Sequence, residues 1–171
     1  GIPIVDLMTG MYTTVAVLAA LARRNETGVG DNIDIGMLDV QVATLSNQAM
    51  NYLVSGKVPA RNGNAHPNIQ PQDVYACADG DVILVVGNDG QFAKLCSVLN
   101  RTEWVTDARF ASNAQRVRNI GTLSGMLRED FLRWTREKLI AALDVVGVPC
   151  GAINSVAEVF EDPQVRARGM L

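Results

Sequence analysis

The sequence predicts an α/β fold for the first part of the chain and a smaller α+β unit for the rest, on three observations. Apolar residues recur at helical spacing on both sides of a short alternating stretch at 33–37. A stretch rich in proline and asparagine follows at 57–72. Beyond it, two strand-like runs flank a turn dipeptide and precede helical patterns. Helix, strand and helix in succession is the alternation expected around a mostly parallel sheet.

In the first part, a helix is expected to begin near Met8 and to end near Asn25 and Gly28, residues that tolerate the left-handed conformation of a helix cap. The alternating apolar residues of 33–37 then predict a short strand. Helical spacing resumes from Leu38 to Tyr52. The residues that place the first helix, at steps of three and four on one face, are Met11, Val15, Leu18 and Ala22.

The middle of the chain is predicted to be a linker and loop, because turn-forming residues crowd residues 57–72. After it, Val74–Cys77 and Val82–Val86 flank Asp79-Gly80, a dipeptide suited to a tight hairpin turn. The expected domains are therefore residues 1–56, a linker at 57–72, and a small α+β domain at 73–171. Its further elements are helices at about 91–99, 114–132 and 136–146, a strand at 148–153 and a last helix at 156–160.

Composition and charge exclude several classes of protein. With 48% hydrophobic and 19% charged residues, the 171-residue chain has an ordinary globular composition and is not expected to be disordered. Its formal net charge of -3 provides no basic field for phosphate backbones, so no nucleic-acid partner is expected. The longest uncharged stretches, Leu7–Ala22 and Val40–Gly56, fall short of the ~20 apolar residues of a membrane span, so no membrane partner is expected.

The cysteines and the single histidine limit the possible chemistry. Cys77, Cys96 and Cys150 are widely spaced and form no CxxC pair, which argues against a disulfide framework and a thiolate zinc site and favours the cytoplasm. Cys150 has no basic neighbour to stabilise a thiolate, so we expect it to pack as an apolar residue. Because His66 is the only histidine, neither a two-histidine metal site nor a catalytic triad can form elsewhere in the chain, and no metal is expected.

Asp6 is a residue for which two roles remain open. It follows the apolar pair Ile4-Val5 and precedes the predicted first helix, where a strand would pass into a helix N-terminus. Unpaired backbone N–H groups and the positive end of the helix dipole favour an ionised carboxylate at such a position. Asp6 is therefore either an N-cap residue or a carboxylate nucleophile.

Six segments along the chain resemble motifs of a known family. They are Val5–Tyr12, Thr27–Ile35, Asn64–Ile69, Val86–Phe92, Gly147–Gly151 and Asp162–Val165. In this order they resemble the class III CoA-transferases, over nearly the whole chain. The resemblance implies that residues 1–56 end a Rossmann-like large domain and that residues 73–171 form the small domain. It also implies that Asp6, the aspartate of the D-x-x-T-G-M pattern, is the catalytic nucleophile.

The resemblance implies a reaction that moves CoA between carboxylic acids, with an acyl-CoA and a free acid as substrates and no metal. The Asp6 carboxylate would attack the thioester, and the returning CoA thiolate would convert the resulting anhydride into an aspartyl-CoA thioester. A second acid would then take the CoA. Backbone N–H groups near the helix start would stabilise the oxyanions. Asn64 and His66 are candidates for the substrate loop, and the alternative that they only form loop structure stays open.

Two departures from the family pattern limit these expectations. In formyl-CoA transferases a run of glycines covers the aspartate, whereas the comparable residues 61–68 contain one glycine, so formyl or oxalyl specificity is not expected. The family's N-terminal region, which supplies most CoA contacts, would lie upstream of this chain. The chain alone is therefore expected to be inactive and to bind CoA weakly, and a homodimer is expected for the full-length parent.

Two alternatives to CoA transfer remain open. The superfamily also includes α-methylacyl-CoA racemases, in which the equivalent aspartate is an acid/base that works with an upstream histidine. The other alternative is a non-catalytic, truncated module that cannot bind CoA by itself.

Overall fold

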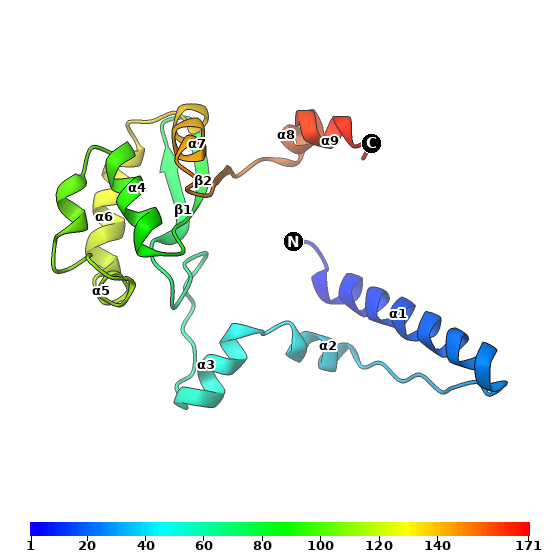
Figure 1. The fold of residues 1–171 in the computed structure, drawn as a ribbon. Helices are drawn as coiled ribbons and strands as arrows, with labels where there is room; N and C mark the ends of the chain where they lie inside the picture. Colours follow the sequence, from blue (N-terminus) through cyan, green and yellow to red (C-terminus); the bar gives the residue numbers. More distant parts are fainter. The chain divides into compact units, whose positions relative to one another are not determined.

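The computed structural model describes all 171 residues, which form two units, residues 1–61 and residues 62–171. The boundary lies inside the stretch 57–72 that the sequence marks as loop. Figure 1 shows the elements of each unit. Unit 1 contains α1 (Ile4–Thr27), α2 (Met37–Ala43) and α3 (Asn47–Ser55).

Helix α1 begins earlier than predicted. Pro3 is its N-cap residue, and the Pro3 carbonyl accepts a hydrogen bond from the Leu7 N–H at 3.2 Å. The predicted start at Met8 and the strand expected just before it are therefore wrong. Pro3 was the available signal, because the restricted φ of proline suits the start of a helix. The helix ends as predicted at Gly28, whose φ of 73° allows its N–H to reach the Arg24 carbonyl at 2.8 Å.

None of the residues of α1 is buried within unit 1. By length and composition alone, the helix is suited to crossing a membrane. The same properties are found in helices that other parts of a protein cover, and the expectation of no membrane partner stays a prediction. The exposed apolar side chains of α1 include Leu7, Met11, Val15 and Leu18.

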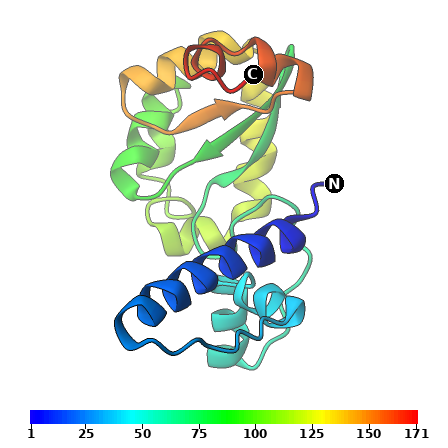
Figure 2. The same ribbon diagram turned by 90° about the vertical axis from the view of Figure 1, so that its right-hand side faces the viewer.

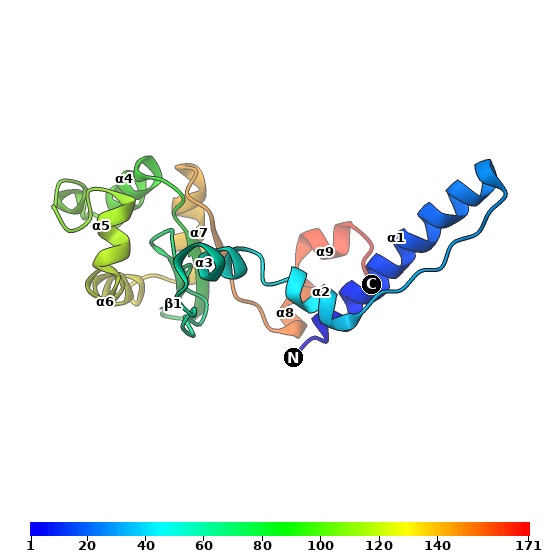
Figure 3. The same ribbon diagram turned by 90° about the horizontal axis from the view of Figure 1, so that it is seen from below.

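The strand predicted at 33–37 does not form. Residues 28–36 run back along α1 without regular secondary structure (Figure 3), and an ion pair of 2.6 Å joins Arg23 to Asp31. A strand requires a hydrogen-bonded neighbour, and the only sheet in the chain lies in unit 2. The predicted helix from Leu38 to Tyr52 is likewise two helices. They are separated near Ser46, whose φ of 49° is uncommon for a residue with a side chain.

Unit 2 contains an antiparallel sheet in the order β1-β2-β3, formed by β1 (Gln72–Cys77), β2 (Gly80–Val85) and β3 (Cys150–Ala152). The predicted hairpin is confirmed: Cys77 pairs with Gly80 across the turn. Alternate residues of the hairpin are buried, as expected for a sheet with one covered face. These buried residues are Tyr75, Cys77, Val82 and Leu84.

Helices pack around this sheet to form the core of unit 2 (Figure 2). Helix α6 contacts β1, and α7 contacts β2 and β3. The predicted helix 114–132 is divided at Asn119, whose φ of -109° and ψ of 22° depart from helical values and whose side chain donates hydrogen bonds to the carbonyls of Gln115 and Arg109. The helices are α4 (Asp89–Val98), α5 (Asn113–Arg118), α6 (Ile120–Phe131), α7 (Arg136–Val145), α8 (Val156–Glu161) and α9 (Pro163–Ala167), with a 3₁₀ turn at Thr102–Val105.

Candidate active site

Asp6 lies in the first turn of α1, as the third residue of the helix. The N-cap interpretation of Asp6 is therefore wrong, since Pro3 occupies that position and no side chain caps the helix. The Asp6 side chain is exposed and forms neither a hydrogen bond nor an ion pair within the chain. A carboxylate in the first turn is stabilised by the helix dipole. Asp6 is thus an unpaired anion at the positive end of a long helix.

Free backbone donors lie beside this carboxylate. The Ile4 N–H donates to the Ile2 carbonyl at 2.9 Å. The Leu7 N–H donates to the Pro3 carbonyl, which is the first helical hydrogen bond of α1. The N–H groups of Val5 and Asp6 have no acceptor in the chain, as is usual in a first helical turn. Two adjacent unpaired N–H groups are suited to binding an oxyanion.

The threonine of the D-x-x-T-G-M pattern supports the helix itself. The Thr9 hydroxyl donates to the Val5 carbonyl at 2.7 Å, one helical turn back. Its proton is therefore engaged and is not directed to a ligand. Thr9 is half-buried, in contrast to the exposed Asp6.

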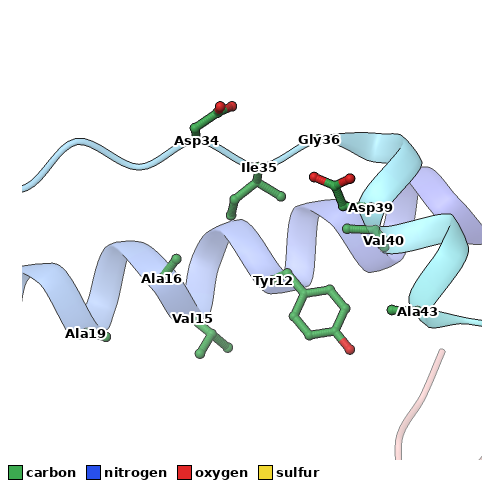
Figure 4. Close-up of a pocket in the computed structure, with 10 residues that line it drawn as sticks. All are labelled: Tyr12, Val15, Ala16, Ala19, Asp34, Ile35, Gly36, Asp39, Val40 and Ala43. Carbon is green, nitrogen blue, oxygen red and sulfur yellow. The ribbon is translucent and has the colours of Figure 1, made fainter.

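An open groove of about 510 Å³ runs between α1 and the segment that follows it in unit 1 (Figure 4). Ile35 points toward α1, and Ala16 lies on the facing side of the helix. The Asp39 carboxylate lies over Gly36, where a Cβ would come within 2.9 Å of it. Asp6 does not line this groove. The remaining lining residues are Tyr12, Val15, Ala19, Asp34, Val40 and Ala43.

Asn64 and His66, the candidates for the substrate loop, belong to unit 2. Asn64 lies in a turn closed by a hydrogen bond of 3.1 Å from the Ala65 N–H to the Asn62 carbonyl. Gly63 makes this turn possible with a φ of 61°. The Asn64 side chain is exposed and has no hydrogen-bond partner in the chain.

The imidazole of His66 is held by its own loop. Its Nδ1 atom accepts hydrogen bonds from the N–H groups of Asn68 and Ile69, each at 3.1 Å. A ring nitrogen that accepts two N–H donors carries no proton, so the neutral ring holds its proton on Nε2. Nε2 has no partner in the chain. The half-buried His66 therefore presents one unpaired donor.

The structure adds residues that sequence reasoning missed. The loop around His66 is bonded to Asn113 and Arg116 of α5, which lie more than forty positions away in the sequence. Neither residue is part of a local motif, so the sequence contained no signal for this role. Asp6 belongs to unit 1, whereas Asn64 and His66 belong to unit 2.

The cysteines are free thiols, and two of them have pKa values far above the ordinary range. Burial raises the pKa of Cys96 to about 12 and that of Cys150 to about 11. A thiol with such a pKa is protonated and unreactive near neutral pH. The packing role expected for Cys150 is consistent with this. The structure contains no group of three or more His, Cys, Asp or Glu residues that could hold a metal ion.

Unit 1 thus has an unpaired aspartate in the first turn of a helix, and unit 2 combines a small antiparallel sheet with helices. The chain belongs to CoA-transferase family III, whose profile matches it over residues 1–171. The Succinate--glutarate CoA-transferase of Agrobacterium fabrum is 46% identical over 170 residues. The human Succinyl-CoA:glutarate CoA-transferase is 36% identical over 171 residues.

The chain spans about two fifths of the length of these relatives: 42% of the Agrobacterium protein and 39% of the human one, while 99% and 100% of the chain is matched. Solved structures show the same fold. A CAIB/BAIF family protein from Brucella suis, 48% identical, matches 99% of the chain and 45% of its own length with a TM-score of 0.81. A Mycobacterium tuberculosis protein, 27% identical, matches 98% of the chain and 43% of its own length with a TM-score of 0.84.

Proposed function

We propose that this chain is the nucleophile-bearing and substrate-loop portion of an acyl-CoA:carboxylate CoA-transferase, with Asp6 as the nucleophile. The observation on which this depends is an exposed, unpaired carboxylate beside the free N–H groups of Val5 and Asp6. The carboxylate lies in the segment that resembles the family's D-x-x-T-G-M pattern. An unpaired carboxylate is free to act as a nucleophile, whereas one committed to an ion pair is not.

The reaction proceeds through two anhydrides. An Asp6 oxygen attacks the thioester carbonyl of the acyl-CoA, the C–S bond breaks, and CoA leaves as a thiolate. The thiolate attacks the aspartyl carbonyl of the anhydride and releases the first acid as a carboxylate. A second carboxylate then attacks the aspartyl-CoA thioester, forms a second anhydride with Asp6 and expels the CoA thiolate. The thiolate attacks the carbonyl carbon of the second acid in this anhydride, which yields the new acyl-CoA and regenerates the Asp6 carboxylate. The N–H groups of the first turn stabilise the oxyanions of these steps.

The acids exchanged are proposed to be dicarboxylates. The relatives from Agrobacterium and human are named for succinate and glutarate. Further relatives are named for mesaconate and D-citramalate, which are also dicarboxylic acids, and one is named for acetyl-CoA and oxalate. Only one carboxylate of such an acid reacts with Asp6. The other carboxylate of the same substrate would require a separate hydrogen-bond donor or cation in the site to bind it.

The complete reaction is proposed to need a polypeptide of full family length, acting as a homodimer. Unit 1 buries a single residue, Val40, so its helices do not enclose a site for CoA on their own. The isolated 171-residue chain is accordingly expected to show no turnover and serves as the inactive reference in the assays below.

Substitution of Asp6 tests the mechanism directly. In a polypeptide of full family length that contains these residues, Asp6→Ala and Asp6→Asn should lower the rate of CoA transfer at least about a thousandfold, because the covalent route is lost. The assay follows transfer from succinyl-CoA to glutarate. A hydroxylamine-sensitive adduct should form on Asp6 and disappear in both variants.

Glu26→Gln, at the other end of α1, is the matched control and should leave the rate unchanged. Turnover that survives in Asp6→Ala would remove Asp6 as the nucleophile. Solvent deuterium uptake at the α-carbon without an adduct would indicate racemisation in place of transfer.

A further inference from the structure

The loop at residues 62–72, which precedes β1, is an ordered structure in which hydrogen bonds hold the polar groups around His66. Two residues of α5 bond it to the rest of unit 2, in addition to the bond of 3.0 Å from the Val86 N–H to the Pro71 carbonyl. The Asn113 side chain accepts a hydrogen bond from the Gln70 N–H at 3.0 Å and donates to the Asn68 carbonyl at 2.9 Å. The fully buried Arg116 donates from Nε to the Gln70 carbonyl at 2.8 Å. Asn68 and Gln70, both on the C-terminal side of His66, are thereby attached to one helix.

The Gln70 side chain connects the part of the loop that is bonded to α5 with His66. Its side chain is buried, accepts a hydrogen bond from the Gln72 N–H at 3.0 Å, and donates to the His66 carbonyl. The His66 N–H in turn donates to the Gln72 carbonyl at 3.0 Å. The backbone of His66 is therefore bonded on both sides, by residues that are themselves fixed.

The ring is fixed as well as the backbone. Nδ1 accepts from the N–H groups of Asn68 and Ile69, and the Asn68 peptide is positioned by Asn113. A rotation of the ring would leave two loop N–H groups without an acceptor, which is costly for the partly buried Ile69 N–H. The one polar group of this network that has no partner is Nε2–H.

We propose that His66 is a fixed, uncharged hydrogen-bond donor of the acyl site, which binds a carboxylate or acyl oxygen through Nε2–H, and that Asn113 is its positioning residue. The identity of the ligand rests on the proposed function. During transfer the same acyl group exists as an anionic acid and as an uncharged thioester. A neutral donor can bind both forms, whereas a cation would favour the acid and retain it.

The first test reads the ring directly in the 171-residue chain. His66 is the only histidine, so long-range ¹⁵N–¹H spectra of the imidazole contain one set of signals. The neutral ring should show a protonated Nε2 and an unprotonated Nδ1. Asn113→Ala should increase the Nδ1–H tautomer at least about threefold, because the Asn68 peptide is released.

Asn119→Ala is the matched control. Asn119 also bonds to carbonyls through its side chain at the end of α5, but these carbonyls belong to Arg109 and Gln115 and not to the loop. This variant should leave the tautomer unchanged. A predominant Nδ1–H tautomer in the unsubstituted chain, or equal effects of the two substitutions, would overturn the positioning role of Asn113.

The second test separates binding from chemistry in a polypeptide of full family length. His66→Asn retains an acceptor for the loop N–H groups but lacks the distal donor, and should raise the KM for glutarate about fivefold to tenfold with a smaller change in kcat. His66→Gln, whose amide N–H can reach the position of Nε2–H, should recover part of this loss.

The Asp6 adduct distinguishes the two proposals. It should still form in both His66 variants when the donor thioester is saturating. An unchanged KM in both variants, with the adduct intact, would overturn the role of His66 and leave the proposed function standing. Absence of the adduct from the unsubstituted enzyme would instead overturn the proposed function.

Discussion

A single arginine joins three separate segments of unit 2. Arg116 is fully buried and donates to the carbonyls of Gln70 and Phe110 and to the Asp89 carboxylate, at 2.6 to 2.9 Å. Its guanidinium also lies 4.5 Å from the centre of the Phe92 ring. A planar guanidinium with five donors can serve several acceptors at once, which an ammonium cannot do in the same geometry. Because Asp89 is largely exposed, the two buried carbonyl bonds matter more than the ion pair.

Replacing this arginine should therefore destabilise unit 2. Arg116→Lys removes the planar guanidinium with its five donors while keeping the positive charge. It should lower the free energy of unfolding by about 3 kcal/mol, since the buried charge then lacks its full set of hydrogen-bond partners. Urea unfolding followed by tryptophan fluorescence measures the change. Arg118→Lys, at an exposed position of the same helix, is the control and should alter the stability by less than about 0.5 kcal/mol. Equal effects of the two substitutions would contradict this role for Arg116.

At the residue scale, the sequence revealed local signals and missed distant ones. The hairpin residues Asp79 and Gly80 were recognisable because turn chemistry depends on neighbouring residues. Asp6 was singled out by its place in a motif, although its position in the helix was wrong. The bonds of Arg116 to Asp89 and Gln70, and that of Asn113 to Asn68, join residues 27 to 46 positions apart and follow no periodic pattern. Only the folded arrangement shows them.

Among the elements, α8 is a short helix whose start depends on one glutamate. Glu158 accepts a hydrogen bond from the Ser155 N–H at 2.7 Å and completes a capping box with the Ser155 side chain. The same carboxylate accepts a bond of 2.9 Å from Arg136, the first residue of α7. Glu158 thus both starts α8 and attaches it to α7.

These bonds make α8 sensitive to acid. The Ser155 N–H, Arg136 and the Ser155 hydroxyl lower the pKa of Glu158 from 4.5 to about 2. Because the folded pKa lies below the unfolded value, the stabilisation is complete above pH 4.5 and is lost as the pH falls toward 2. Amide signals of α8 in ¹⁵N–¹H spectra should lose their helical shifts over this range, before those of α6.

Glu158→Gln should produce the same loss at neutral pH, whereas the exposed Glu129→Gln should leave α8 unchanged. Helical shifts of α8 that persist in Glu158→Gln would show that the carboxylate is not required.

The elements that sequence reasoning misjudged share a physical cause. The alternation at 33–37 is typical of a strand, but an isolated strand has no hydrogen-bonded neighbour, and unit 1 supplies none. The helix predicted at 114–132 is interrupted at Asn119, whose side chain bonds to the Gln115 carbonyl and to the Arg109 carbonyl outside the helix. In both cases the outcome depends on partners that a periodic pattern does not contain. The Rossmann-like description of the large domain stays a prediction.

For the molecule as a whole, apolar burial is divided unequally between the two units. Val40 is the one buried residue of unit 1, whereas the remaining buried hydrophobic residues all belong to unit 2. Exposed apolar residues of α1 lie on several faces of the helix, and such surfaces require a covering partner in water. The relatives are more than twice as long as this chain, and additional chain of that length could cover α1.

This division predicts unequal local stability in the 171-residue chain. Amides of α6 and β2 should exchange slowly, because they belong to the buried core of unit 2, whereas those of α1 should exchange with almost no protection. Hydrogen exchange followed by mass spectrometry resolves the two units within one sample. As a control, residues 62–171 alone should unfold in urea with a midpoint close to that of the whole chain, since unit 1 contributes hardly any core. Protection of α1 equal to that of α6 in a monomeric sample would contradict the idea that unit 1 depends on surfaces outside this chain for its stability.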